Sequence, residues 1–222
     1  MMGSPFHLAR SRLNSDDPIV FVVDDDARMR DALASLIASK GLRVAVFGSA
    51  SEFLNSEKPD NPGCLVLDLQ LPGINGLELQ RELASTAAPP IVFISGHGDV
   101  PSSVKAMKAG AVEFLSKPFD EQELLQAING AIALDRAVRE RRSALAELRK
   151  HHDRLTPRER EVLPYVLAGY ANKVTAVELG ASEITIAVHR GHIMRKMEAR
   201  SLAELVRMAD TLGVRPHGQP HK

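Results

Sequence analysis

The sequence predicts two domains of different fold class, an α/β domain with a parallel sheet followed by an all-helical domain. The 222 residues exceed the usual domain size of about 100–150 residues. Five short β-rich runs alternate with amphipathic segments in the first half, whereas the rear half shows only helical spacing. A charged stretch without proline separates the two patterns and predicts a long helical connection.

Five strands, each followed by a helical pattern, are expected in the first domain (residues 18–131), after a disordered tail over residues 1–17. Five strand-then-helix units imply a parallel sheet with helices on both faces. The first strand is a continuous apolar run, as is typical of a strand buried on both sides. The expected strands are Ile19–Val23, Val44–Phe47, Cys64–Leu67, Ile91–Ile94 and Glu113–Leu115. Helices are expected before Gly41, from Ser49, over Leu77–Leu83 and Pro101–Ala109, and after Asp120.

The connection over residues 132–154 has a sparse apolar stripe of Leu134, Val138, Leu145 and Leu148 among many charges. From Asp120 to about His152 there is no proline and only one glycine, Gly130. This pattern favours a helical spacer that can pair with its counterpart in a second copy. A solvated flexible linker is the alternative.

Four helices are expected in the second domain (residues 155–214), which a short tail over 215–222 follows. Thr156 and Glu159 form a capping-box pair, with Pro157 at the first helical position. The other helices are expected over about Lys173–Leu179, from Ser182 to about Met197, and from Ser201. The short turn at Gly180 matches a helix-turn-helix. Pro164, inside the first helix, predicts a kink because it removes one backbone hydrogen bond.

The composition is that of a globular protein without a membrane-spanning segment. Lysine plus arginine balance aspartate plus glutamate at 28 each, but residues 19–130 hold 15 acidic against 9 basic residues. A nucleic-acid partner is therefore compatible with the rear half alone. Cys64 is the only cysteine, so it closes no intramolecular disulfide, and we expect a buried, inert thiol. The absence of a secretory signal pattern near the N-terminus predicts a cytoplasmic protein.

Polar side chains follow four of the predicted strands and should meet at one edge of the sheet. They are Asp24, Asp25 and Asp26 after the first strand, Asp68 after the third, Ser95 after the fourth and Lys117 after the fifth. Ligands of such sheets bind beyond the carboxyl ends of the strands. Clustered carboxylates suit Mg²⁺, and a carboxylate can attack phosphorus to give an acyl phosphate. Lys117 can neutralise a phosphoryl oxygen, and Lys117-Pro118 indicates a tight turn that can contain a cis bond.

The first domain resembles the receiver domains of two-component response regulators. The motifs are Val23-Asp24-Asp25-Asp26, Leu67-Asp68-Leu69-Gln70-Leu71-Pro72-Gly73, Ser95-Gly96-His97-Gly98 and Phe114-Leu115-Ser116-Lys117-Pro118-Phe119. The resemblance implies a flavodoxin-like fold, a histidine kinase as partner and Asp68 as the phosphoryl acceptor. It also implies Mg²⁺ bound by Asp25, Asp68 and the Gln70 carbonyl, with Asp24 acting through water. Ser95 and Phe114 would form the switch pair, and His97 receives no chemical role. Asp26 stands where the family often has Glu.

The second domain resembles LuxR-type DNA-binding domains, so the whole chain resembles NarL/FixJ regulators and their FixJ-like branch. The motif residues are Leu155–Leu163, Asn172-Lys173, Leu179-Gly180 and Val188-His189. The resemblance implies that the third helix enters the major groove of promoter DNA. The residues expected at DNA are Lys173, Thr185, Val188, Arg190, Arg195 and Lys196. Ala187 and Gly191 stand where relatives often have polar groups, so we expect modest base discrimination, with a weak binder as the alternative.

These features together predict a transcriptional regulator, not an enzyme, that is switched by phosphorylation of Asp68. We expect a homodimer after phosphorylation and consider RNA polymerase a candidate partner. One alternative is a phosphorylation-independent DNA-binding protein whose first domain serves only for dimerisation. Another is an enzyme passing through an aspartyl phosphate, which would need an acid-base carboxylate at position 70, where Gln70 stands.

Overall fold

The computed structural model describes residues 17–96 and 100–218 and divides into two compact units, Met1–Arg139 and Glu140–Lys222. The tail expected over residues 1–17 lies outside the described residues except for Asp17, and His97 and residues 219–222 lie outside them as well. None of the helices in the described ranges is long and apolar enough to span a membrane.

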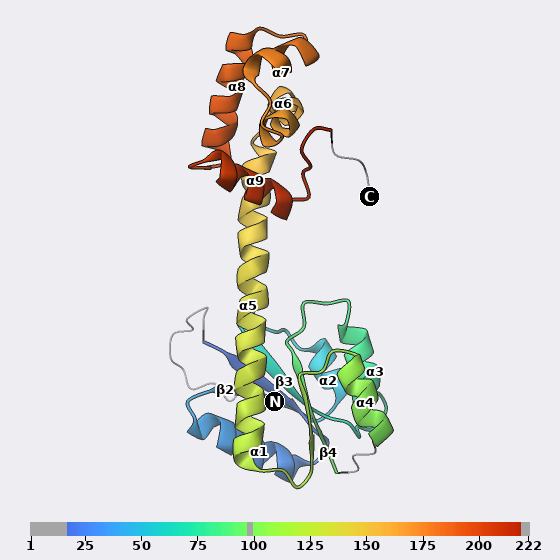
Figure 1. Ribbon diagram of the computed structural model, residues 1–222. Coiled ribbons are helices and arrows are strands. Elements are labelled where there is room, and N and C mark those ends of the chain that lie inside the picture. The colour runs from blue at the N-terminus through green and yellow to red at the C-terminus, as the bar shows by residue number, and fades with distance from the viewer. Residues whose placement is uncertain (1–16, 97–99, 219–222) are drawn as a thin grey trace. The chain divides into compact units, whose positions relative to one another are not determined.

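The first unit is built on a five-stranded parallel sheet, as expected (Figure 1). Its strands are β1 Ile19–Val23, β2 Arg43–Phe47, β3 Gly63–Asp68, β4 Ile91–Ser95 and β5 Glu113–Ser116, in the order β2-β1-β3-β4-β5. All four pairings are parallel, so the carboxyl ends of the strands lie at one edge. In this strand order the chain runs from β1 to β2 toward one side of the sheet and from β3 to β4 toward the other. In sheets of this kind, such a change of direction leaves a crevice at the carboxyl ends of the two strands, here β1 and β3.

Alternate side chains of the strands enter two separate hydrophobic cores. In β1, Phe21 faces a core closed by α2 Ala50–Asn55, α3 Gly76–Leu83 and α4 Val100–Lys108. Val20 and Val22 face the other core, which α1 Ala27–Ser39 and the first part of α5 Glu121–Asp153 close (Figure 1). Burial on both faces explains why these strands read as continuous apolar runs instead of alternating ones. Cys64 is fully buried here, and burial raises the pKa of its thiol, as expected of an inert cysteine.

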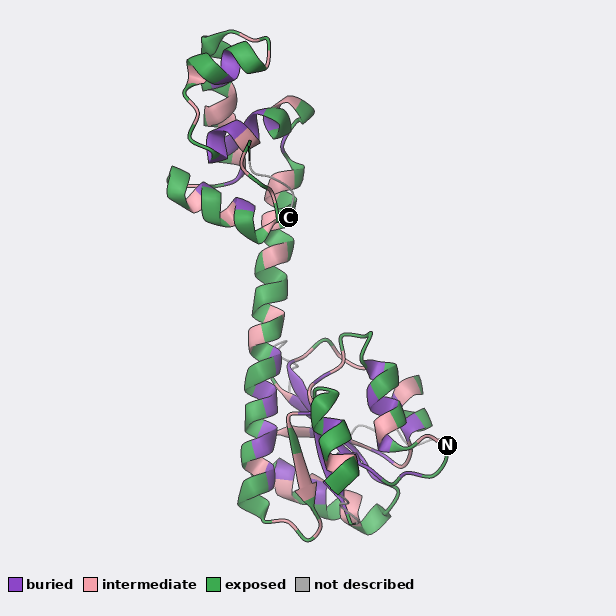
Figure 2. Ribbon diagram, turned by 45° about the vertical axis from the view of Figure 1, so that its right-hand side comes forward, coloured by how far each residue is buried: buried purple, intermediate pink, exposed green. Residues whose placement is uncertain are grey.

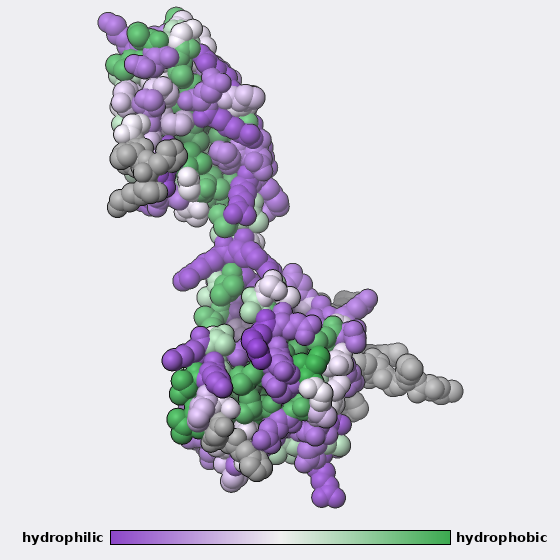
Figure 3. Space-filling model, turned by 90° about the vertical axis from the view of Figure 1, so that its right-hand side faces the viewer, coloured by the Kyte–Doolittle hydropathy of each residue, from purple (hydrophilic) through white to green (hydrophobic). Residues whose placement is uncertain are grey.

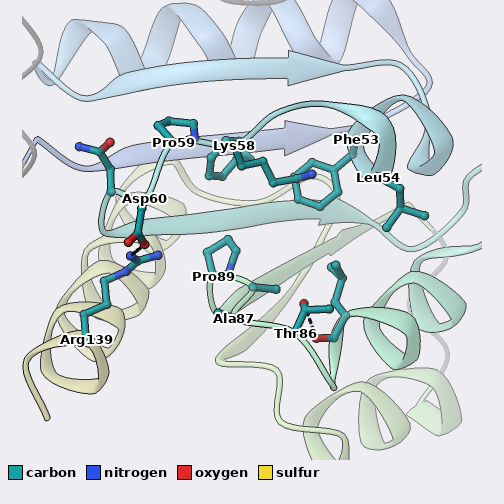
Figure 4. Close-up of a pocket in the computed structure, with 13 residues that line it drawn as sticks. Phe53, Leu54, Lys58, Pro59, Asp60, Thr86, Ala87, Pro89 and Arg139 are labelled. Carbon is teal, nitrogen blue, oxygen red and sulfur yellow. Dashed lines mark hydrogen bonds and ion pairs between the residues drawn. The ribbon is translucent and has the colours of Figure 1, made fainter. Parts of the chain in front are cut away.

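Helix α5 is fixed to the sheet by a buried carboxylate that the sequence did not single out. Asp135 Oδ2 accepts hydrogen bonds of 2.8 Å from the backbone N–H of Gly63 and from Arg139 Nε. Arg139 also pairs with Asp60, beside a shallow hollow that Phe53, Lys58 and Pro89 help to line (Figure 4). The buried residues of α5 lie within its first part, where Figure 2 shows a purple stripe toward the sheet. Because α5 runs without a break from Glu121 to Asp153, the helix expected from Asp120 to about His152 is confirmed.

The second unit contains the four expected helices: α6 Pro157–Leu167, α7 Asn172–Glu178, α8 Glu183–Lys196 and α9 Leu202–Thr211. Thr156 and Glu159 form the predicted capping box, and Ser182 and Ser201 cap α8 and α9. Ile186 and Ile193 of α8, and Met197 directly after it, are fully buried in the core of this unit.

Pro164 lies inside α6, and the helix continues through it to Leu167. Its carbonyl accepts hydrogen bonds from the backbone N–H groups of Ala168, at 3.1 Å, and His217, at 2.9 Å. The His217 ring stacks on Tyr165 with the ring centroids 4.0 Å apart. Residues just beyond α9 therefore pack on α6, in a segment expected to be a tail.

Replacing Pro164 with alanine should stabilise the second unit, because alanine restores a backbone donor inside α6 while the Pro164 carbonyl keeps its partners. We expect the free energy of unfolding to rise by about 1–3 kcal/mol in urea titrations followed by circular dichroism. Pro157→Ala is the matched control, since a proline at the first helical position removes no intrahelical bond. A loss of stability in Pro164→Ala would show that packing of the ring outweighs the missing bond.

Candidate functional site

The carboxyl edge of the sheet brings together the polar side chains expected there. Asp24 follows β1, Asp68 ends β3, Ser95 ends β4 and Lys117 follows β5. Asp24 and Ser95 are fully buried, and Asp68 is only 6% exposed, whereas Asp25 is exposed. Four strand ends thus place carboxylates, a hydroxyl and an ammonium in one crevice.

Lys117 joins the two buried carboxylates. Its Nζ donates to Asp24 Oδ2 at 2.7 Å and to Asp68 Oδ2 at 2.8 Å. Burial alone would lower the pKa of Lys117, but these two hydrogen bonds outweigh it and raise that pKa, so the side chain is a fixed cation. Its backbone N–H donates to the Ser95 carbonyl at 2.7 Å, and the Lys117-Pro118 peptide is cis, in line with the tight turn expected there.

Asp68 combines a buried carboxylate with few direct partners. Its Oδ1 accepts from the Gln70 backbone N–H at 3.0 Å, and its Oδ2 accepts from Lys117. Burial raises the pKa of the Asp68 carboxyl above its ordinary value, and the hydrogen bonds from Lys117 and Gln70 offset this only in part. The charged form of the Asp68 carboxyl is therefore incompletely stabilised by its partners.

Asp24, Asp25 and Asp68 can hold a metal ion together. One oxygen of each lies within 4.8 Å of the others. Hard oxygen ligands of this kind suit Mg²⁺, which usually takes one or two carboxylates and keeps several waters. The ring of Phe114, the expected switch residue, is half-buried beside Phe93, with the ring centroids 6.2 Å apart.

Gly76 packs against the acidic pocket, and the sequence did not single it out. A Cβ at this residue would stand 2.6 Å from the carbonyl oxygen of Asp68 and 3.0 Å from Leu69 Cα. The Gly76 N–H also donates to the Leu69 carbonyl at 3.0 Å. The start of α3 therefore packs directly on the backbone that carries Asp68. The Asn75–Glu78 capping box at this helix was the only signal in the sequence.

The second unit presents a helix-turn-helix in α7 and α8. Of the six residues expected at DNA, Lys173, Thr185 and Arg195 are exposed and Val188 is half exposed. The other two have partners inside the unit: Arg190 donates to the Tyr170 carbonyl at 2.8 Å, and Lys196 to Glu159 at 2.7 Å. Ile184, near the start of α8, is an apolar side chain that is 79% exposed.

Both units match known families of proteins. Residues 20–129 match the response regulator receiver domain, and residues 153–209 match the bacterial regulatory proteins of the luxR family. The chain is 53% identical to nodulation protein W of Bradyrhizobium diazoefficiens, over 90% of this chain and 88% of that protein. It is 44% identical to the transcriptional regulatory protein FixJ of Azorhizobium caulinodans, over 89% and 94% of the two chains. The chain belongs to the NarL/FixJ family of response regulators.

A solved structure supports the fold of this response regulator. The response regulator StyR, at 47% identity, gives a TM-score of 0.81 over 87% of this chain and 98% of its own. The FixJ relatives place our response regulator in the FixJ-like branch. Proteins of this family are DNA-binding transcriptional regulators and not enzymes, so the regulator expected from the sequence is confirmed.

Alanine at position 76 should disturb the response regulator's acidic pocket, because its Cβ would overlap the Asp68 backbone. We expect Gly76→Ala to lower the free energy of unfolding by about 1–3 kcal/mol in urea titrations. Gly130→Ala is the matched control: a Cβ there meets nothing within 4 Å, and alanine should stabilise α5 by up to about 1 kcal/mol. Equal effects at both positions would contradict the close approach at Gly76.

Removing the Asp68 charge should stabilise the receiver at neutral pH. Because the folded pKa of Asp68 lies above its ordinary value of 3.8, the folded state holds the proton more tightly than the unfolded state. The free energy of unfolding therefore falls as the pH rises from the ordinary pKa of Asp68 through its higher folded pKa. Asp68→Asn should be more stable than the wild type at pH 7 in metal-free buffer, and the gain should shrink toward pH 4. Urea titrations from pH 4 to 8 test this, with exposed Asp31→Asn as control; a gain independent of pH would contradict it.

Proposed function

We propose that Asp68 accepts a phosphoryl group from a histidine kinase and thereby controls DNA binding by α8. The observation that carries the proposal is the buried Asp68 carboxylate, which lies beside two other carboxylates and has Lys117 as its cation. In the transfer, an Asp68 carboxylate oxygen attacks phosphorus and the bond from phosphorus to the kinase imidazole nitrogen breaks. Asp68 becomes an acyl phosphate, and the electron pair of the broken bond stays on the imidazole, which leaves as neutral histidine with a proton on one ring nitrogen.

The residues at the carboxyl edge divide the remaining work. Asp25, Asp68 and the Gln70 carbonyl would hold Mg²⁺, with Asp24 acting through water. When bound, the ion neutralises charge on the phosphoryl oxygens. Lys117 keeps its ammonium beside Asp68 and can pair with a phosphoryl oxygen once Asp68 is phosphorylated. The Ser95 hydroxyl, at the end of β4, can donate a hydrogen bond to a second phosphoryl oxygen.

We infer that the signal leaves the pocket through β5 and α4. Movement of Ser95 toward the phosphoryl group lets Phe114 turn inward beside Phe93. The neighbouring helix α4 carries exposed apolar side chains, with Val100 at 74%, Val104 at 44% and Met107 at 43%. Figure 3 looks onto the side of the first unit that carries α3 and α4 and shows hydrophobic patches there. A homodimer through this face would bring two copies of α8 to DNA half-sites.

In DNA binding, α8 enters the major groove with its Thr185 and Val188 toward the bases. Arg195 of α8 and Lys173 of α7 then face phosphates. Arg190 and Lys196 complete the set proposed from the sequence, although each already has a partner within the unit. RNA polymerase is a further candidate partner. Because the proposed target is promoter DNA, we propose that the protein works in the cytoplasm of a bacterial cell.

Acetyl phosphate with Mg²⁺ tests the acceptor in the full chain. Intact-mass and peptide mass spectrometry should show one added phosphoryl group on wild type, located at Asp68, and none on Asp68→Ala. Asp31→Ala, which removes an exposed carboxylate of α1, is the matched control and should be labelled like the wild type.

Light scattering and binding to random-sequence duplex DNA should follow the label. Dimer formation and tighter DNA binding in phosphorylated wild type, with neither in Asp68→Ala, support the switch. Equal oligomeric state and DNA affinity with and without the label would favour the phosphorylation-independent regulator. A label on another residue would overturn the assignment of Asp68.

A further inference from the structure

Three metal-ligating side chains meet in the second unit, away from the acidic pocket. Glu159 lies in the first turn of α6, and His189 and His192 lie in α8. The two histidines are three residues apart and therefore share one face of the helix. One ligand atom of each of the three side chains lies within 4.8 Å of the others. The proposed switch and DNA contacts use none of these groups.

The spacing of two of these groups already fits a bound ion. His192 Nδ1 lies 3.4 Å from Glu159 Oε1. In a tetrahedral site with metal-to-nitrogen distances of about 2.0–2.1 Å, neighbouring ligand atoms stand about 3.3–3.4 Å apart. The His192 side chain is 41% exposed, so an ion can reach the group from solvent.

His189 supplies an independent observation. Its Nδ1 is buried and has no hydrogen-bond partner among the described residues. Most buried side-chain nitrogens are paired, and an unpaired one needs an explanation such as an ion or a water. Because no hydrogen bond fixes the proton at this nitrogen, the imidazole ring can also adopt the tautomer that a metal ion requires.

Glu159 is held as a metal ligand normally is. Its Oε2 accepts from the Thr156 backbone N–H and from Lys196 Nζ, both at 2.7 Å, which leaves Oε1 on the side of His192. Burial would raise the pKa of this carboxyl, but the hydrogen bonds from Lys196 and Thr156 lower it to about 2. The hydrogen bonds on Oε2 therefore orient the carboxylate from behind, with Oε1 toward His192.

We propose that Glu159, His189 and His192 form a binding site for a divalent transition-metal ion of the Zn²⁺ type, joining α6 to α8. Two imidazoles and one carboxylate are a zinc ligand set with a fourth position open to water. Imidazole suits Zn²⁺, Cu²⁺ and Ni²⁺ and is a poor ligand for Mg²⁺, which separates this site from the acidic pocket. The ion would make the stability of the DNA-binding unit depend on metal supply.

Lys196 sets the strength of the site. Its ammonium shares the Glu159 carboxylate, so it repels a divalent ion on the other oxygen. Lys196→Gln should therefore bind Zn²⁺ more tightly, by about tenfold, because one unit of repelling charge is removed. An ordinary ion-pair cluster without a metal function would gain no zinc affinity from this change.

Calorimetric titration of chelator-treated full-length protein with ZnCl₂, in excess Mg²⁺ to occupy the acidic pocket, tests the proposal. Wild type should bind one equivalent that His189→Gln and His192→Gln lose. His152→Gln, a change in the last turn of α5, should keep it. Zinc should also raise the unfolding temperature of wild type and not of His192→Gln.

Nitrogen NMR of the wild-type imidazoles keeps the test independent of how the variants fold. Zinc should shift the ring nitrogens of His189 and His192 and leave those of His151 and His152 in place. Unshifted signals of His189 and His192, or equal zinc binding by His192→Gln and wild type, would overturn the site. Neither result depends on whether Asp68 is phosphorylated.

Discussion

The Lys117 ammonium, held between the Asp24 and Asp68 carboxylates, is the interaction on which the receiver depends. Two buried carboxylates in one crevice repel each other, and a cation at 2.7 and 2.8 Å makes their joint burial tolerable. The three side chains follow or end β1, β3 and β5, so the ion pairs also join the carboxyl ends of three strands. The same cation is available to a phosphoryl group, so one contact serves both the resting fold and the proposed chemistry.

Some cationic side chains of the second unit pair with groups inside the unit, and others are exposed to solvent. Lys196 neutralises the buried Glu159, and Arg190 supports the turn before α7 through the Tyr170 carbonyl. Arg195 and Lys173 remain exposed for an anionic partner. These internal contacts hold α8 in a fixed orientation, which the proposed contact with base edges would require.

Local patterns in the sequence were enough to predict most of the fold. The apolar run Ile19–Val23 is β1 without change, because a strand buried on both faces is apolar at every position. The helix caps are also where they were expected, because capping depends on residues close in the chain; they are Ser49, Thr156, Ser182 and Ser201. The acidic pocket was also predictable, since parallel strands bring their carboxyl ends to one edge.

Contacts between residues far apart in the chain were not predictable. Gly76 looks like an ordinary turn glycine until α3 is seen to touch the Asp68 backbone. The stacking of His217 on Tyr165 and the unpaired Nδ1 of His189 likewise depend on packing that no periodicity encodes. The partners of Arg190 and Lys196 show the same limit, because a basic residue on a helix gives no sign of which carboxylate or carbonyl it meets.

Strand β3 is tied down at both of its ends. Gly63, its first residue, donates to Asp135 of α5, and Asp68, its last, pairs with Lys117. Inserting or deleting a residue between them would turn alternate side chains to the wrong core and break one of the two attachments. The length of β3, six residues, is therefore tied to the distance between these two attachments, whereas the loop over residues 57–61 before it lies outside them.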